Sequence, residues 1–218
     1  MFAYACAMPH MRTSTSLSPT VLLTGFGPFP GMPENASAPL VRVVAQRARA
    51  AFRDHRFHAA VLPTEWHAAP QRVTALISRL QPFLSLHFGV AQDTHGFRIE
   101  TQGLNTCRRA PDAAGRLPLD QVLVVGGPDT HPSSLPIDAI VDRLQALDLP
   151  VTTSQDAGGY LCNAVLYHAL HTPRRPNVQA RAGFIHIPTV FAGAPLTFET
   201  AVTGCLAIID ASLREKHA

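Results

Sequence analysis

Short apolar segments alternate with segments of helical periodicity through the first half of the chain. Strands are predicted over Val21–Thr24, Phe57–Leu62 and Phe83–Val90, and helices over Ser37–Phe52 and a region from Thr64 to Leu80. Strands that alternate with helices in this way are typical of a parallel sheet with helices on both faces. The order therefore predicts an α/β fold: a three-layer α/β/α sandwich around a mostly parallel, twisted sheet.

The second half of the chain is less regular. A long excursion from Asn105 to His131 interrupts the alternation. The remaining predicted elements are extended pieces at Phe97–Glu100, Gln121–Val125, Pro150–Ser154 and Ala182–Pro188, and helices at Pro136–Leu147, Tyr160–Leu170 and Thr197–Leu213. Ser37 and Thr197 are the expected N-caps of the first and last helices.

The size and hydrophobicity of the chain fit a single domain. With 218 residues, of which 46% are hydrophobic, the chain can bury one large core. We expect this domain to span residues 20–218 and to follow a poorly ordered leader over residues 1–19. No basic residue precedes the short apolar run at the start, so a signal peptide is not expected. No stretch approaches the roughly 20 apolar residues of a membrane-spanning helix.

Charge and cysteine content argue against several classes of protein. The formal net charge is +3 and only 15% of residues are charged, which gives little support to nucleic-acid binding. The cysteines, Cys6, Cys107, Cys162 and Cys205, are too few and too scattered for a disulfide framework. We therefore expect a reducing compartment, the cytoplasm.

Cys162 follows a turn at the start of a predicted helix. The segment Asp156-Ala157-Gly158-Gly159 separates a short strand from this helix and places Cys162 in its first turn. Free N–H groups and the positive end of the helix dipole favour a thiolate at that position. Cys162 is therefore a candidate nucleophile. The alternative is that it is a small buried apolar side chain.

His186 is the best-placed base for such a nucleophile. It lies near the end of the predicted strand over residues 182–188, at the edge where open parallel sheets hold their ligands. Glu100, at the end of a short strand, could fix the tautomer of the imidazole. The alternative for His186 is a hydrogen-bonded core histidine. Sequence spacing alone does not bring Glu100, Cys162 and His186 together.

Two phenylalanines, Phe26 and Phe29, lie in a segment rich in glycine and proline after the first strand. If both are outside regular structure, they form an aromatic binding surface on a rigid loop. If both point inward, they plug the end of the core.

Three separated motifs of this chain match those of one protein family. The first is Thr24-Gly25-Phe26-Gly27-Pro28-Phe29 with Asn35-Ala36-Ser37, the second is the segment from Ser154 to Asn163, and the third is Gly183-Phe184-Ile185-His186-Ile187-Pro188. They resemble the first signature, the nucleophile motif and the histidine motif of the pyroglutamyl peptidases of the pyrrolidone-carboxylate peptidase type. The resemblance covers roughly residues 21–213, and the segment from Glu100 to Asn105 matches the family at its Glu and Asn.

The resemblance implies an activity and a set of catalytic residues. Members of the family remove an N-terminal pyroglutamyl residue from peptides, with Cys162, His186 and Glu100 in the places of nucleophile, base and partner. It also implies a single α/β/α domain of the phosphorylase/hydrolase-like type, no cofactor, no metal, and a homo-oligomer such as a dimer or tetramer.

The same resemblance implies a substrate pocket. A pyroglutamyl group is a small uncharged lactam, which calls for flat apolar walls without a buried charge. Phe26 and Phe29 would supply those walls, and Tyr160 or the main chain near Val90 would complete the pocket. Arg109 aligns with an arginine near the developing oxyanion. This chain departs from many members at Val90 and Thr101, where they carry Gln and Arg.

Two other functions remain as alternatives. Histidine pairs at His168 and His171 and at His55 and His58 would suit a metal-dependent hydrolase, although neither pair has a glutamate in a recognised zinc spacing. A non-catalytic small-molecule-binding module on the same fold would leave Cys162 inert.

Overall fold

The computed structural model describes residues 18–175, 179–191, 193 and 196–214. Of the leader predicted over residues 1–19, residues 1–17 lie outside this description. Pro19 already belongs to the fold, because its carbonyl accepts a hydrogen bond of 2.9 Å from the backbone N–H of Arg56.

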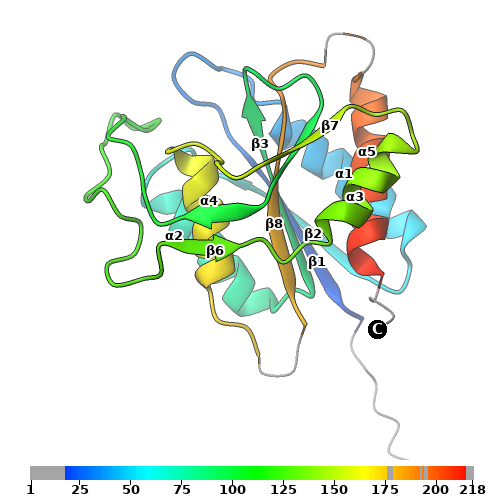
Figure 1. The fold of residues 1–218 in the computed structure, drawn as a ribbon, viewed down its shortest axis with the longest axis horizontal. Helices are drawn as coiled ribbons and strands as arrows, with labels where there is room; N and C mark the ends of the chain where they lie inside the picture. Colours follow the sequence, from blue (N-terminus) through cyan, green and yellow to red (C-terminus); the bar gives the residue numbers. More distant parts are fainter. Residues whose placement is uncertain (1–17, 176–178, 192, 194–195, 215–218) are drawn as a thin grey trace, which may run out of the picture.

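Helices and strands alternate along the described chain, apart from four successive strands in its middle (Figure 1). In chain order they are β1 (Thr20–Phe26), α1 (Ser37–Ala51), β2 (Arg56–Leu62), α2 (Ala68–Leu80), β3 (Leu84–Ala91), β4 (Phe97–Glu100), β5 (Gln102–Leu104), β6 (Thr130–Pro132), α3 (Ile137–Gln145), β7 (Val151–Ser154), α4 (Leu161–His171), β8 (Arg181–Pro188) and α5 (Phe198–Leu213).

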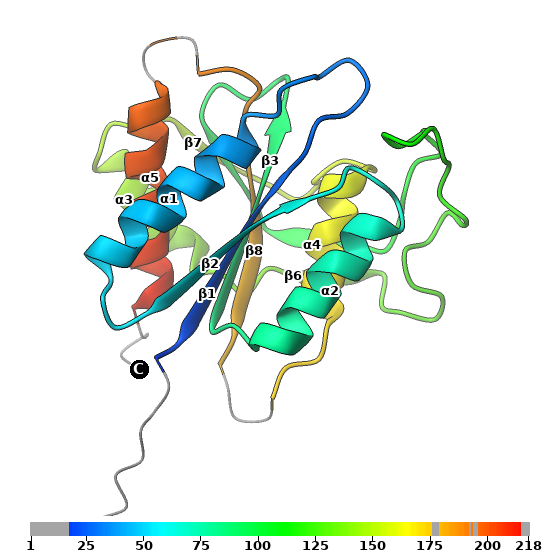
Figure 2. The ribbon, with the colours of Figure 1, turned by 180° about the vertical axis from the view of Figure 1, so that it is seen from behind.

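The central sheet has six strands in the order β2-β1-β3-β8-β4-β7. Helices α1, α3 and α5 cover one face and α2 and α4 cover the other (Figures 1 and 2). Each face has its own apolar cluster, and β1 is buried along its whole length because it is covered on both sides. All strand pairs in this sheet are parallel except β4 with β8. The predicted three-layer sandwich with a mostly parallel sheet is confirmed.

The direction of β4 is the feature that most affects the site. Only residues 92–96 connect β3 to β4, whereas two parallel strands of one sheet need a crossover of a dozen or more residues between them. The chain therefore reverses, and β4 runs antiparallel to β8, with Arg98 opposite His186 and Glu100 opposite Phe184. Glu100, at the end of β4 as predicted, therefore reaches His186 diagonally across an antiparallel pair.

The strand predicted over Gln121–Val125 is wrong. The backbone N–H groups of Leu123 and Val124 donate to the side-chain oxygen of Asn105, at 3.0 and 2.9 Å, and no partner strand lies beside them within the described residues. The excursion instead contributes β6, which pairs antiparallel with β5 in a separate two-stranded sheet.

One of the two predicted helix caps is confirmed. Thr197 is the N-cap of α5 and accepts a hydrogen bond of 3.2 Å from the backbone N–H of Thr200. Ser37 is not a cap: α1 begins at this residue, and its hydroxyl accepts a hydrogen bond of 2.9 Å from the backbone N–H of Phe26. The close approach depends on Gly25, where a Cβ would lie 2.5 Å from the carbonyl oxygen of Ser37.

Within the described ranges, no helix combines the length and apolar character needed to cross a membrane.

Candidate active site

Cys162 lies in the first turn of α4, as predicted, and is half-buried. The preceding loop is shaped by local hydrogen bonds: Gly158 N–H donates to the Asp156 carboxylate at 2.9 Å, and Asp156 N–H donates to the Ser154 hydroxyl at 3.1 Å. Gly158 has a φ of +77°, a conformation that glycine adopts without strain. The loop thus carries the chain from the edge strand β7 to the start of α4.

Gly89 makes room for the sulfur of Cys162. A Cβ at this position would lie 2.8 Å from Cys162 Sγ and 2.7 Å from the ring of Phe184. Gly89 on β3 also lies directly opposite His186 on β8. The sulfur therefore lies over the sheet at the level of the His186 imidazole.

His186 is buried and interacts with both other members of the predicted triad. Its Nδ1 lies 2.7 Å from Glu100 Oε1, and Glu100 is 0% exposed. Burial lowers the pKa of His186, but the charge of Cys162 and side-chain hydrogen bonds to Cys162 and Glu100 outweigh this and raise its pKa to about 9. The imidazole is therefore held as an imidazolium at neutral pH, which suits a group that pairs with a thiolate and delivers a proton.

A cavity of about 950 Å³ opens beside Cys162 and His186. Of the residues that the sequence analysis expected to bind the substrate, Phe29, Val90 and Tyr160 line it. Tyr160 packs edge-on against Trp66, with ring centroids 5.1 Å apart. These side chains give the cavity an apolar wall next to the sulfur.

Phe26 does not line this cavity. It is the last residue of β1, is 2% exposed, and packs against Phe184 with ring centroids 6.3 Å apart. The two phenylalanines of this motif therefore have different environments. Phe26 belongs to the core, and Phe29 faces the cavity. The physical reason is that β1 extends further than predicted, and alternate residues of a strand point to opposite faces.

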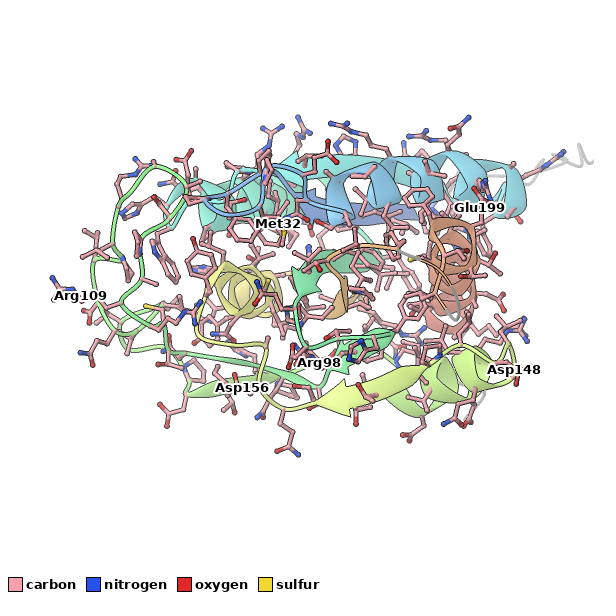
Figure 3. The ribbon with its side chains drawn as sticks, turned by 90° about the horizontal axis from the view of Figure 1, so that it is seen from above. Met32, Arg98, Arg109, Asp148, Asp156 and Glu199 are labelled. Carbon is pink, nitrogen blue, oxygen red and sulfur yellow. The ribbon has the colours of Figure 1, made fainter. Side chains whose placement is uncertain are left out.

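Arg109 also lies outside the cavity. It is exposed and points away from the molecule (Figure 3). Its neighbour Arg108 lines the cavity instead, with its guanidinium over the Tyr160 ring at 5.5 Å from the centroid. The backbone N–H of Arg108 donates to the Gly159 carbonyl at 2.7 Å, which fixes this residue against the loop before Cys162.

The similarity of this chain to known proteins shows the family to which it belongs. The family model described as pyroglutamyl peptidase matches residues 19–213. The chain belongs to the pyroglutamyl peptidase family. It is 35% identical over 207 residues to pyrrolidone-carboxylate peptidase 1 of Ralstonia nicotianae, covering 91% of this chain and 95% of that protein. It is 37% identical over 194 residues to the pyrrolidone-carboxylate peptidase of Chromobacterium violaceum, covering 87% of this chain and 89% of that protein.

Solved structures of the family share the fold. A mutant pyrrolidone carboxyl peptidase from Pyrococcus furiosus is similar with a TM-score of 0.80 and 27% identity, covering 89% of this chain and 98% of that one. Pyroglutamyl peptidase I of Bacillus amyloliquefaciens is similar with a TM-score of 0.79 and 25% identity, covering 89% of this chain and 96% of that one.

Sequence reasoning missed three residues that shape the site of this pyroglutamyl peptidase. Gly89 accommodates the sulfur, and Arg98 donates to Glu100 Oε1 from its Nε at 3.3 Å. Asn163, fully buried, exchanges hydrogen bonds of 2.9 and 2.8 Å with the backbone of Leu104 and so joins α4 to the segment after Glu100. Only their positions in the sequence could have indicated them: Gly89 lies near the end of a buried strand, Arg98 lies two residues before Glu100, and Asn163 follows Cys162.

The histidine pairs do not form a metal centre in the part of the chain that the structure describes. No group of three or more His, Cys, Asp or Glu side chains is placed there to hold a metal ion. His171 instead lies with its Nδ1 3.0 Å from His131 Nε2 and stacks on Tyr167.

Proposed function

We propose that this protein removes the N-terminal pyroglutamyl (5-oxoprolyl) residue from peptides, as a pyroglutamyl-peptidase I type cysteine peptidase. Cys162 is the nucleophile, His186 the general base and acid, and Glu100 the residue that orients His186. The observation that carries this assignment is the position of the His186 imidazole, between the sulfur above Gly89 and the buried carboxylate of Glu100.

Acylation begins when the Cys162 thiolate attacks the carbonyl carbon of the pyroglutamyl residue. A C–S bond forms and the carbonyl oxygen takes the electron pair. First-turn N–H groups of a helix lack intrahelical partners, so those of α4 are available to stabilise this oxyanion. The intermediate collapses as the C–N bond breaks and the His186 imidazolium donates its proton to the leaving amine.

Deacylation releases the pyroglutamate. His186, now neutral, takes a proton from a water molecule as the water oxygen attacks the thioester carbonyl. The C–S bond then breaks and restores the thiolate. Throughout both steps Glu100 keeps the Nδ1 side of the ring engaged, so that Nε2 faces the reaction.

The apolar part of the cavity suits an uncharged lactam ring. Phe29, Val90 and Tyr160 line it next to Cys162, and we assign the ring contacts to them. Phe26 packs against Phe184 in the core, and we assign neither Phe26 nor Arg109 to the ring pocket. Asp93 and Arg108 also line the cavity, and we assign the rest of the peptide to its polar part.

We assign this protein to a reducing compartment, the cytoplasm, because the catalytic thiol must stay reduced. A homo-oligomer, either a dimer or a tetramer, is supported by apolar side chains exposed on the excursion at the left of Figure 1, among them Leu119 at 88% and Val125 at 81%. Light scattering coupled to gel filtration measures the subunit number.

The experiment that tests the function compares release of a fluorophore from pyroglutamyl, prolyl and glutamyl derivatives. We expect turnover of the pyroglutamyl derivative alone, because the other two carry a charged amine or carboxylate. Cys162→Ser should lower kcat by roughly 10³-fold or more while thermal unfolding stays unchanged.

Two controls separate the alternatives. A metal-dependent hydrolase would lose activity on exhaustive chelation and keep it in iodoacetamide, the reverse of what we expect. A binding module would bind the pyroglutamyl derivative without turnover. Wild-type kcat in Cys162→Ser would remove Cys162 from the mechanism.

A further inference from the structure

His186 is flanked on both sides along one row of the sheet. Gly89 on β3 lies opposite His186, and Arg98 on β4 lies opposite it on the other side. The sulfur of Cys162 occupies the space above Gly89. The imidazole therefore has a thiol on one side and an arginine on the other, and side chains of residues opposite each other in neighbouring strands lie on the same face.

Arg98 connects two carboxylates. Its Nε lies 3.3 Å from Glu100 Oε1, the same oxygen that interacts with His186 Nδ1, and its Nη1 lies 2.9 Å from Asp93 Oδ2. The Arg98 side chain is 21% exposed and lines the cavity, whereas Asp93 is 76% exposed. Figure 3 shows Arg98 in the middle of the molecule, near the ends of the central strands, while Arg109 points outward.

The buried carboxylate of Glu100 needs a neighbouring group whose positive charge persists throughout the reaction. It is 0% exposed, and its Oε2 has no hydrogen-bond partner among the described residues. His186 compensates the carboxylate only while it is an imidazolium, and it loses that proton when it protonates the leaving amine. A buried carboxylate left beside a neutral imidazole is costly. A guanidinium, unlike an imidazolium, does not give up its proton during a proton-transfer reaction.

We propose that Arg98 is a positioning residue for the catalytic pair. It holds the Glu100 carboxylate in place when His186 becomes neutral, so that the ring keeps its orientation for deacylation. Through Asp93 it also ties the 92–96 connection, which forms part of the cavity wall, to the same carboxylate. The proposal rests on the function assigned above to Cys162, His186 and Glu100.

The charged groups around His186 determine how kcat/KM is expected to depend on pH. They are Cys162 from α4, Glu100 and Arg98 from β4, and Asp93 from the connection after β3. Removing Arg98 removes a cation beside the imidazolium, so the alkaline limb of kcat/KM should move to higher pH, by about half a unit. A merely structural role for Arg98 would leave this limb in place.

The test compares R98M, R98K and, as a matched control, R47M. Arg47 also pairs with a carboxylate, that of Glu199 at 2.8 Å, but far from the cavity. We expect R98M to lower kcat by about 10- to 100-fold with KM within about threefold, because the ring loses its orientation. R98K keeps the charge and should recover most of the kcat and the wild-type pH limb. R47M should match the wild type.

A second readout does not use a peptide substrate. The rate at which iodoacetamide alkylates Cys162, followed by mass spectrometry of its peptide across pH, reports the thiolate–imidazolium pair directly. The alkaline part of this plot of alkylation rate against pH should shift in R98M and not in R98K. If the wild type hydrolyses no pyroglutamyl derivative, the proposed function fails, and this measurement still decides the role of Arg98.

Three results would overturn the proposal. The first is a wild-type kcat and alkylation profile in R98M. The second is a rise in KM alone, which would make Arg98 a substrate contact. The third is an R98K variant that is folded by near-UV circular dichroism and as inactive as R98M.

Discussion

Glu100 illustrates how much one side chain depends on its neighbours. Its carboxylate is buried, interacts with His186 at 2.7 Å and accepts from Arg98 at 3.3 Å through one oxygen. In water such contacts are worth little, but in a buried site they fix the orientation of an imidazole. The orientation of the His186 imidazole therefore depends on Glu100, a buried side chain that does not line the cavity.

Phe26 and Phe29 are expected to respond differently to truncation. Phe29→Ala removes a cavity wall, so KM for a pyroglutamyl derivative should rise roughly 10-fold with a small change in kcat. Phe26→Ala leaves a core cavity beside Phe184 and should cost about 3–5 kcal/mol of unfolding free energy. Steady-state kinetics and urea unfolding of both variants separate the two roles. A KM effect in Phe26→Ala without loss of stability would contradict this division.

The strands β3, β8 and β4 together form the floor of the site. β3 leaves space for the sulfur at Gly89, and β8 supplies the imidazole of His186. β4 supplies the carboxylate of Glu100 and the guanidinium of Arg98. Strand register decides which residues face one another, and a slip by one residue would turn every one of these side chains to the opposite face.

Gly89→Ala is expected to inactivate the enzyme. The added methyl group would lie 2.8 Å from Cys162 Sγ and 2.7 Å from the Phe184 ring, so the sulfur must move away from His186. Displacement of a reacting atom by about 1 Å can cost about 10²-fold in rate, and overpacking costs about 1–3 kcal/mol. Kinetics and thermal unfolding measure both. The control is Gly27→Ala, whose Cβ would meet nothing closer than 3.6 Å; wild-type activity in Gly89→Ala would contradict the placement of the sulfur.

Across the whole molecule, a buried histidine links stability to pH. His87 on β3 is 0% exposed, its Nδ1 lies 2.7 Å from the Thr24 hydroxyl, and its Nε2 has no partner in the described part of the chain. Burial, with a contribution from the charge of Arg174, lowers the pKa of His87 from 6.5 to about 3. The native state therefore holds this imidazole neutral.

We expect the protein to lose stability on acidification below pH 6.5. Between this value and about 3 the unfolded chain binds a proton at His87 that the folded chain does not, so unfolding free energy falls by about 1.4 kcal/mol per pH unit. His87→Gln should flatten this slope in urea unfolding at several pH values. The matched control, the exposed His95→Gln, should keep it. An unchanged slope in His87→Gln would contradict the prediction.

Local sequence patterns were sufficient to predict most elements and the three residues, Glu100, Cys162 and His186, that the structure brings together. Helical periodicity, apolar runs and the Asp156 to Gly159 turn act between residues close in the chain, so the positions of α4, β8 and Cys162 followed from the sequence. Contacts between residues far apart in the chain could not be predicted from these local patterns. Which of Phe26 and Phe29, or of Arg108 and Arg109, faces the cavity depends on where a strand ends and on contacts with distant loops.

The antiparallel direction of β4 is the clearest example of a feature that local sequence patterns do not predict. The sequence determined that Phe97–Glu100 is extended, because its residues favour a buried strand, but a strand carries no information about its neighbour. Folding placed β8, nearly a hundred residues later in sequence, between β3 and β4. Only that insertion brought Arg98 and Glu100 beside His186, because hydrogen bonding between strands depends on their positions in space and not on their distance along the chain.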